Sequence, residues 1–210
     1  MNQSAAALIQ LIHKHDLRIF NTSDIITLGR MSSGGATQAL SRLADKGILA
    51  RLKRGLWANL LMKSIHPYEA VPFLAAPWPA YISLYSALAD YGLIAEIPQI
   101  VYGVSPAPTA TYKTFMGSFR IHHLPAHLMW GYEMKKSGTG GYLMAEPEKA
   151  FLDLAYLALT PRSSLQLPYK RARRWRLNHP KLRMYTLRFG YKPLKEYIRR
   201  TIPNIFAGVR

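Results

Sequence analysis

The first sixty residues contain three short helix patterns followed by a basic hairpin pattern, and this order constrains the fold more than any other feature. The first helix is expected over residues 4–15, where Ser4 can cap its N-terminus. The second is expected over residues 21–29, between a polar Asn-Thr-Ser-Asp start and a glycine stop. The third is expected over residues 32–46, where apolar residues recur at helical spacing.

The hairpin is predicted from residues 48–52 and 56–60, two short apolar runs around the turn Lys53-Arg54-Gly55. Gly55 permits the turn, and Trp57 is expected to anchor it to the core. Three helices followed by such a hairpin are the layout of a winged helix-turn-helix. In that layout the third helix enters the DNA major groove, and the hairpin contacts the flanking backbone or the minor groove.

Short polar side chains occupy the face of the third helix opposite its apolar stripe. Hydroxyl, amide and guanidinium groups are the ones that contact base edges and phosphates. The predicted DNA-binding residues are Thr37, Gln38, Ser41 and Arg42 on the helix, with Arg51, Lys53 and Arg54 on the hairpin. The alternative is a solvated polar face, because most helices in globular proteins have one.

The net charge of +17 indicates a polyanionic partner, most often nucleic acid and less often an anionic membrane surface. Residues 161–210 hold 14 Lys and Arg against one acidic residue, and aromatic side chains lie among them. A second nucleic-acid or partner contact is predicted at Lys170, Arg171, Arg173, Arg174 and Arg176. The alternatives are a helical domain end with buried aromatics, or a basic surface that docks on an acidic protein.

Two further segments carry a family resemblance. Residues 83–93 are Ser-Leu-Tyr-Ser-Ala-Leu-Ala-Asp-Tyr-Gly-Leu, and residues 147–154 are Pro-Glu-Lys-Ala-Phe-Leu-Asp-Leu. Together with Leu-Ser-Arg-Leu, Gly-Ile-Leu and Arg-Gly-Leu-Trp in the first sixty residues, they resemble the AbiEi antitoxins of abortive-infection and type IV toxin–antitoxin operons. The resemblance covers most of residues 1–160.

The resemblance implies a cytoplasmic DNA-binding antitoxin that represses its own promoter through inverted repeats. It also implies a nucleotidyltransferase-like toxin that the larger domain counters. Alternatives are a stand-alone winged-helix regulator, a toxin-neutralising module and an RNA-binding module. The expected fold class is α+β, with a winged helix-turn-helix over residues 1–62, a connector over 63–80, and a larger mixed α/β domain over 81–210 whose very basic segment is 161–210.

Neither an enzyme nor a cofactor is expected. The chain has no cysteine, which suits a reducing compartment and removes thiolate zinc sites. His122, His123 and His127 are expected to be ordinary strand and loop residues rather than metal ligands. The Gly-rich residues 137–141 lack the Lys-Ser/Thr ending of a phosphate loop, so a hairpin turn is expected.

The last predictions concern the helix that follows Pro147 and the most apolar segments of the chain. A helix is expected over residues 148–159, with structural roles for its acidic residues and a Lys149–Asp153 pair at i, i+4 spacing. No stretch of 18 apolar residues escapes proline or charge, so no membrane span is predicted.

Overall fold

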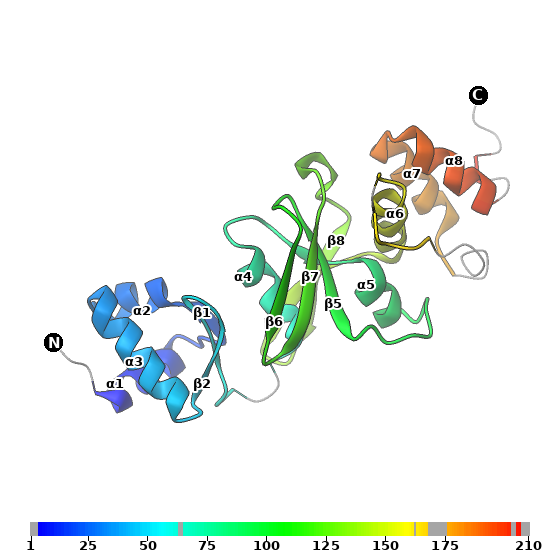
Figure 1. Ribbon diagram of the computed structural model, residues 1–210. Helices are drawn as coiled ribbons and strands as arrows, with labels where there is room; N and C mark the ends of the chain where they lie inside the picture. The colour runs from blue at the N-terminus through cyan, green and yellow to red at the C-terminus, as the bar shows by residue number, and fades with distance from the viewer. Residues whose placement is uncertain (1–3, 63–64, 162, 168–175, 203–204, 207–210) are drawn as a thin grey trace.

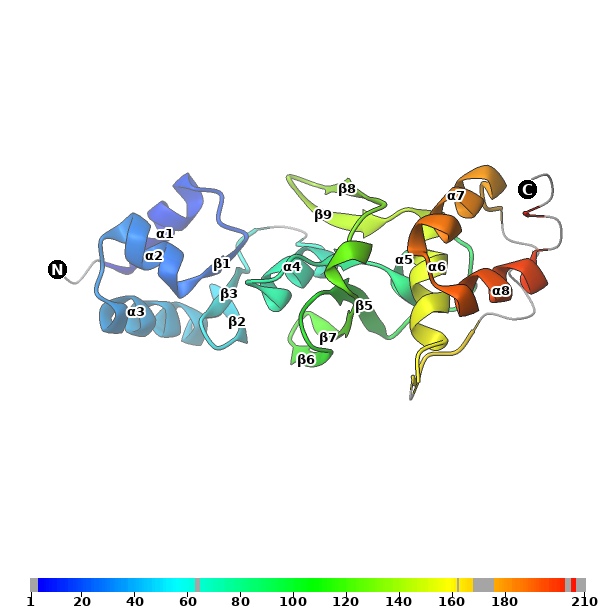
Figure 2. The ribbon, with the colours of Figure 1, turned by 90° about the horizontal axis from the view of Figure 1, so that it is seen from above.

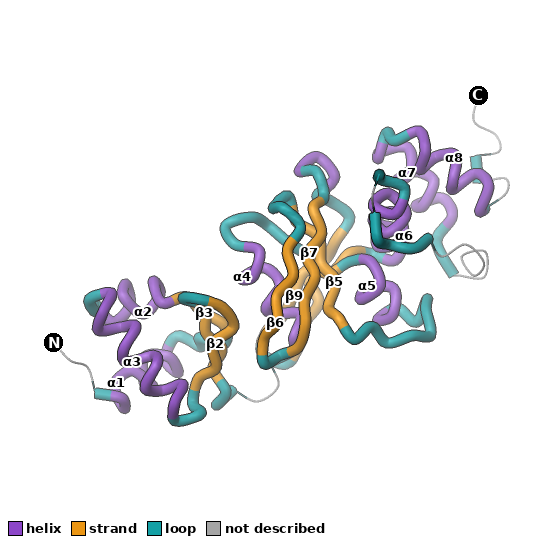
Figure 3. The backbone as a smooth tube through the Cα atoms, viewed as in Figure 1, coloured by secondary structure: helices purple, strands orange, loops and turns teal. Residues whose placement is uncertain are grey.

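The computed structural model describes residues 4–62, 65–161, 163–167, 176–202 and 205–206. It begins with a winged helix, as predicted, and continues into a larger sheet domain with helices at its far end (Figure 1; Figure 3). The fold class is therefore confirmed. The first part contains α1 (Ala5–Lys14), β1 (Ile19–Asn21), α2 (Thr22–Gly29), α3 (Ser33–Asp45), β2 (Leu49–Lys53) and β3 (Leu56–Asn59).

Local signals set the helix limits close to where the sequence indicates. The Ser4 hydroxyl accepts a hydrogen bond from Ala7 N at 3.2 Å, and the Ser32 hydroxyl accepts one from Gly35 N at the same distance. The strand β1 was not predicted, because three residues carry too little periodicity. It pairs with β3, so the hairpin β2–β3, here called the wing, belongs to a three-stranded antiparallel sheet of order β1-β3-β2.

The winged-helix sheet is buried on both faces. One face packs with the three helices in a core that includes Leu8, Phe20, Leu40 and Trp57. The other face contributes Ile19, Leu52, Leu56 and Ala58 to the core of the sheet domain. The strands of the wing consequently lie between two hydrophobic cores, while the side chains of Arg51 and Arg54 stay exposed.

The sheet domain contains a six-stranded mixed sheet of order β6-β7-β5-β4-β9-β8. Its pairs are antiparallel, except that β5 runs parallel to β7 and β4 runs parallel to β9. Its elements are η1 (Pro67–Ala70), α4 (Val71–Ala75), β4 (Tyr81–Ile82), α5 (Leu84–Asp90), β5 (Ile100–Ser105), β6 (Ala110–Thr114), β7 (Gly117–His123), η2 (Ala126–Leu128), β8 (Tyr132–Ser137), β9 (Gly140–Ala145) and α6 (Pro147–Ala158).

Two of these strands were missed by the sequence analysis. The edge strand β8 has the polar sequence Tyr-Glu-Met-Lys-Lys-Ser, which shows no buried face. The strand β4 is only two residues long, and α5 begins two residues after it, at Leu84. Within the segment expected as a connector, Ala70, Val71 and Leu74 are buried in the core of the sheet domain.

The described part of the basic tail folds into α7 (His179–Phe189) and α8 (Lys192–Thr201), which pack on α6. Tyr185, Phe189 and Tyr197 are buried there, so these aromatics serve the core and are not available for stacking on bases. The winged helix and the pair α7–α8 lie at opposite ends of an elongated molecule (Figure 1). Among the described helices, none is long and apolar enough to cross a membrane.

Candidate nucleic-acid interface

The outer face of α3 presents the polar residues that the sequence analysis selected. Ala36, Ala39, Leu40 and Leu43 are buried against the other helices, which leaves Thr37, Gln38, Ser41 and Arg42 exposed on the opposite face. The Thr37 hydroxyl donates to Ser33 O at 2.9 Å. Within the described part of the chain the side chains of Gln38, Ser41 and Arg42 have no hydrogen-bond or ion-pair partner. One amide, one hydroxyl and one guanidinium are thus available to a ligand on one helix face.

The turn before α3 adds a cation that the sequence analysis did not select. Arg30 caps α2 in the left-handed conformation, with φ of 48°, and its side chain is exposed. Gly34, in the first turn of α3, is also exposed, and a Cβ placed on it would meet no atom within 4 Å. The N-terminal end of α3 is therefore unobstructed. In the sequence, Arg30 could have been selected as a basic residue in the turn between the second and third helices.

Two of the three predicted wing cations reach the surface. Arg51 is exposed on β2, where its guanidinium carbon lies 5.9 Å from the centroid of the Trp57 ring. Arg54 is exposed at the turn. Gly55 has a φ of 75°, the left-handed region that favours glycine, and Trp57 Nε1 donates to Thr22 Oγ1 at 2.9 Å. These contacts fasten the wing to the N-terminal end of α2.

Lys53 points toward the sheet domain instead. Its ammonium group donates to Leu74 O at 2.9 Å and lies 5.7 Å from the centroid of the Tyr112 ring. Burial lowers the pKa of Lys53, as expected for an ammonium group that has left water. The structure therefore does not bring Lys53 together with Arg51 and Arg54 on one accessible surface.

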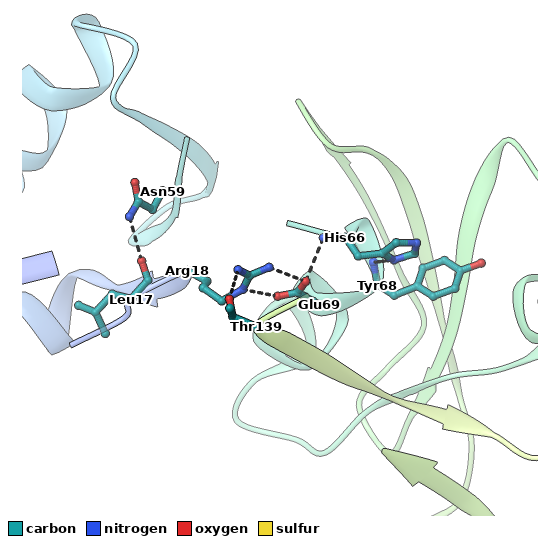
Figure 4. Close-up of polar contacts among 7 residues, drawn as sticks. All are labelled: Leu17, Arg18, Asn59, His66, Tyr68, Glu69 and Thr139. Carbon is teal, nitrogen blue, oxygen red and sulfur yellow. Dashed lines mark hydrogen bonds and ion pairs between the residues drawn. The ribbon is translucent and has the colours of Figure 1, made fainter. Parts of the chain in front are cut away.

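A polar clamp holds the wing sheet against the sheet domain (Figure 4). Arg18, which precedes β1, donates to both carboxylate oxygens of Glu69, at 2.8 and 2.9 Å, and to Thr139 Oγ1 at 2.9 Å. The backbone N–H of His66 also donates to Glu69, at 3.0 Å. The hydrogen bond from Arg18 to Glu69 raises the pKa of Arg18, which stays charged. We call Arg18, Glu69 and Thr139 the interdomain clamp.

Most of the tail residues predicted to contact nucleic acid or a partner lie outside the part of the chain that the structure describes. Lys170, Arg171, Arg173 and Arg174 lie outside the described residues. Arg176 is described and exposed. It closely precedes α7, which lies at the end of the molecule opposite α3 (Figure 1). The structure therefore does not join Arg176 to the α3 surface.

The three histidines do not converge. His122 is buried beside Arg120, and burial with this neighbouring charge lowers its pKa to about 4. His123 is exposed, with Nδ1 3.1 Å from Pro106 O, and His127 is exposed in η2. No group of three His, Cys, Asp or Glu side chains that could hold a metal ion occurs among the described residues.

The other candidate motifs serve the fold. Residues 138–139 form the turn of the β8–β9 hairpin, as predicted. Lys149 and Asp153 form a fully buried ion pair on α6. Glu148 Oε1 accepts a hydrogen bond from Asn178 N at 2.7 Å. Glu146 accepts hydrogen bonds from Lys181 and Tyr185 and so ties α6 to α7.

A comparison with known protein families finds a match over the winged helix. Residues 7–59 match the model of a family described as "Transcriptional regulator, AbiEi antitoxin". The resemblance noted in the sequence is thereby confirmed over the winged helix. A search of curated proteins finds no match to the chain.

Proposed function

We propose that this protein, whose winged helix is similar to that of a family of antitoxin transcriptional regulators, binds double-stranded DNA through α3 and the wing. The observation that carries the proposal is the outer face of α3, where Gln38, Ser41 and Arg42 are exposed without partners in the described chain. An α-helix fits the major groove, where amide and guanidinium groups distinguish base pairs. Thr37 adds a hydroxyl near the same face.

The exposed arginines have a separate role in this proposal. Arg51 and Arg54 contact phosphates of the flanking backbone, which fix the orientation of α3 without specifying sequence. Arg30, in the turn before α3, supplies a third phosphate contact. Lys53 holds the wing on the sheet domain through Leu74 O and leaves the phosphates to its neighbours.

The finer role follows from the resemblance. We propose that the chain represses its own promoter in the cytoplasm by binding inverted repeats, and that it counters a nucleotidyltransferase-like toxin. Residues 1–62 act as the DNA-binding domain, and residues 81–210 as the antitoxin and regulatory domain. The motifs at residues 83–93 and 147–154 support this assignment. A stand-alone regulator would keep the DNA-binding role and lack the toxin.

Fluorescence anisotropy with the DNA upstream of the gene tests the DNA-binding role. Arg42→Gln should weaken binding about fivefold at 0.15 M salt and lower the slope of log K against log salt by about one. Lys136→Gln, on the exposed strand β8, removes the same charge and should leave both quantities unchanged.

Two results would contradict the proposal. Equal affinity of the wild-type protein for the upstream region and for a scrambled sequence would remove sequence recognition by α3. Identical salt slopes for the wild type and Arg42→Gln would remove Arg42 from the interface.

A further inference from the structure

The strand β8 leaves one edge of the six-stranded sheet open. In the described part of the chain it is hydrogen-bonded as a strand on one side only, to β9, because it ends the strand order. The strand at the other end of the sheet, β6, is in contact with β2 of the wing. In Figure 2, β8 follows the outline of the molecule on the side away from α3. Such an edge presents a row of unpaired backbone N–H and C=O groups to another strand.

The side chains of β8 combine one exposed apolar residue with charges of both signs. Met134 is 64% exposed near the middle of the strand. Glu133 and Lys135 flank it and share the opposite face of the strand, where Lys135 Nζ lies 2.6 Å from Glu133 Oε1. The order acidic, apolar, basic is therefore centred on Met134.

A second copy of this chain is the partner that this order fits. Two identical antiparallel strands related by a two-fold axis pair so that one residue lies opposite itself and its neighbours lie opposite each other. With Met134 on the axis, Glu133 of each copy lies opposite Lys135 of the other. The four charges then alternate in sign along and across the two strands, and opposite charges directly across an antiparallel pair are stabilising. The two Met134 side chains cover each other on the other face.

The other symmetric registers bring like charges together or leave most of β8 unpaired. An axis through Glu133 places this carboxylate opposite itself, and an axis through Lys135 or Lys136 does the same for an ammonium group. An axis through either end of the strand leaves half of it without a partner. Charged residues on an edge normally oppose strand pairing. On β8 they select the single register centred on Met134.

We propose that the chain forms a symmetric dimer in which β8 pairs antiparallel with β8 of a second copy, centred on Met134. The two sheets then form one continuous sheet. Six residues from each copy make a small interface, and small interfaces associate weakly, so we expect a Kd of about 10–100 μM. Because α3 lies on the other side of the molecule, the pairing leaves its polar face uncovered (Figure 2). The dimer does not depend on the DNA-binding role.

Sedimentation equilibrium of the full chain at low salt, over concentrations that span this range, tests the charge pairing. Glu133→Lys and Lys135→Glu each place like charges opposite each other, and each should raise the Kd about tenfold. The double variant Glu133→Lys with Lys135→Glu restores opposite charges and should recover the wild-type Kd. Lys113→Glu, on the other edge strand of the sheet, makes the same charge reversal and should leave the Kd unchanged.

A single cysteine tests the register directly. The chain contains no cysteine, so Met134→Cys introduces its only thiol. Residues directly opposite in an antiparallel pair have Cα atoms about 4.5–5.5 Å apart, a separation that a disulfide can bridge. Mild oxidation should convert Met134→Cys to a covalent dimer. Phe115→Cys, which is similarly exposed in the turn between β6 and β7, should stay monomeric.

The results that would overturn the proposal are distinct from those that test DNA binding. A wild-type protein that stays monomeric over the whole series removes the dimer. Equal dimerisation of the wild type and both single reversals, or equal cross-linking of the two cysteine variants, removes β8 from the interface. Single reversals that weaken the dimer without rescue by the double variant would show that the register is wrong. The effect of Arg42→Gln on DNA binding is measured separately and is unaffected by any of these outcomes.

Discussion

At the scale of single residues, Lys149 and Asp153 show how a charged pair can occupy a core. Both side chains are fully buried, and Asp153 also accepts hydrogen bonds from Tyr81 Oη at 3.0 Å and Ser83 Oγ at 2.8 Å. The Lys149 ammonium group donates to Tyr81 Oη at 2.8 Å and lies 4.8 Å from the centroid of the Trp130 ring. The pair has lost its hydration, and this burial raises the pKa of Asp153 and lowers that of Lys149.

We expect Asp153→Ala to lower the free energy of unfolding by about 3–5 kcal/mol, because it leaves the Lys149 ammonium group buried without its counter-ion. The double variant Lys149→Met with Asp153→Leu should lose much less, since it removes both charges and keeps volume in the core. Urea denaturation of the two variants measures the difference. Equal losses in both would show that packing, rather than the unpaired charge, sets the cost.

At the scale of elements, the β8–β9 hairpin acts as the third side of the interdomain clamp. Thr139 supplies a hydroxyl to Arg18, and the next residue has no side chain where the clamp needs space. A Cβ on Gly140 would lie 2.6 Å from Arg18 Nε, and it would also collide with the Glu69 carboxylate. The first position of β9 therefore requires glycine because of neighbours that are distant in sequence.

Gly140→Ala should displace the Arg18–Glu69 pair and lower the free energy of unfolding by about 1–3 kcal/mol, the cost of disturbing a buried charge-assisted hydrogen bond. Gly34→Ala is the matched control, because a Cβ there meets open space within α3. It should change stability little or raise it by up to about 1 kcal/mol. Thermal unfolding of the two variants, compared with the wild type, gives the answer. If the Gly140→Ala protein is as stable as the wild type, the interdomain clamp does not contribute to the free energy of unfolding.

At the scale of the whole molecule, the wing sheet joins two cores. Its helix-facing side belongs to the winged helix, and its other side carries Ile19, Leu52, Leu56 and Ala58 into the core of the sheet domain. Burying a Leu or Ile side chain is worth about 1.5–3 kcal/mol. The two parts of the chain therefore stabilise each other, although each has its own hydrophobic cluster.

We expect a fragment of residues 1–62 to be less stable than the same residues in the full chain, and to bind a hydrophobic dye, because it exposes the sheet-domain face of the wing. Leu52→Lys should improve the solubility of the fragment, whereas in the full chain it should lower the free energy of unfolding. A solubility assay of the fragment and urea denaturation of the full chain, each with and without Leu52→Lys, measure these two opposite effects. A fragment that is as stable as the full chain, with no dye binding, would mean that the interdomain contact contributes nothing.

The sequence predicted the elements with strong local signals. The caps at Ser4 and Ser32, the spacing of Ala36, Ala39, Leu40 and Leu43, and the Gly55 turn were sufficient to place α1, α3 and the wing. The short or polar strands β1, β4 and β8 were missed, because each is recognised only through the strands that pair with it. Of the predicted α3 contacts, all four proved to be exposed, as amphipathic spacing requires.

By itself, the sequence determined the three helices and the hairpin of the winged helix, the polar face of α3 and the excess of positive charge, since these depend on near neighbours and composition. The tertiary structure alone decided the direction of the wing cations. Lys53 and Arg54 are adjacent in the chain, yet Leu74 O and the Tyr112 ring draw Lys53 into the domain interface and leave Arg54 exposed. The physical reason is that burial and hydrogen-bond partners come from residues far along the chain, and no local pattern in residues 48–60 contains them.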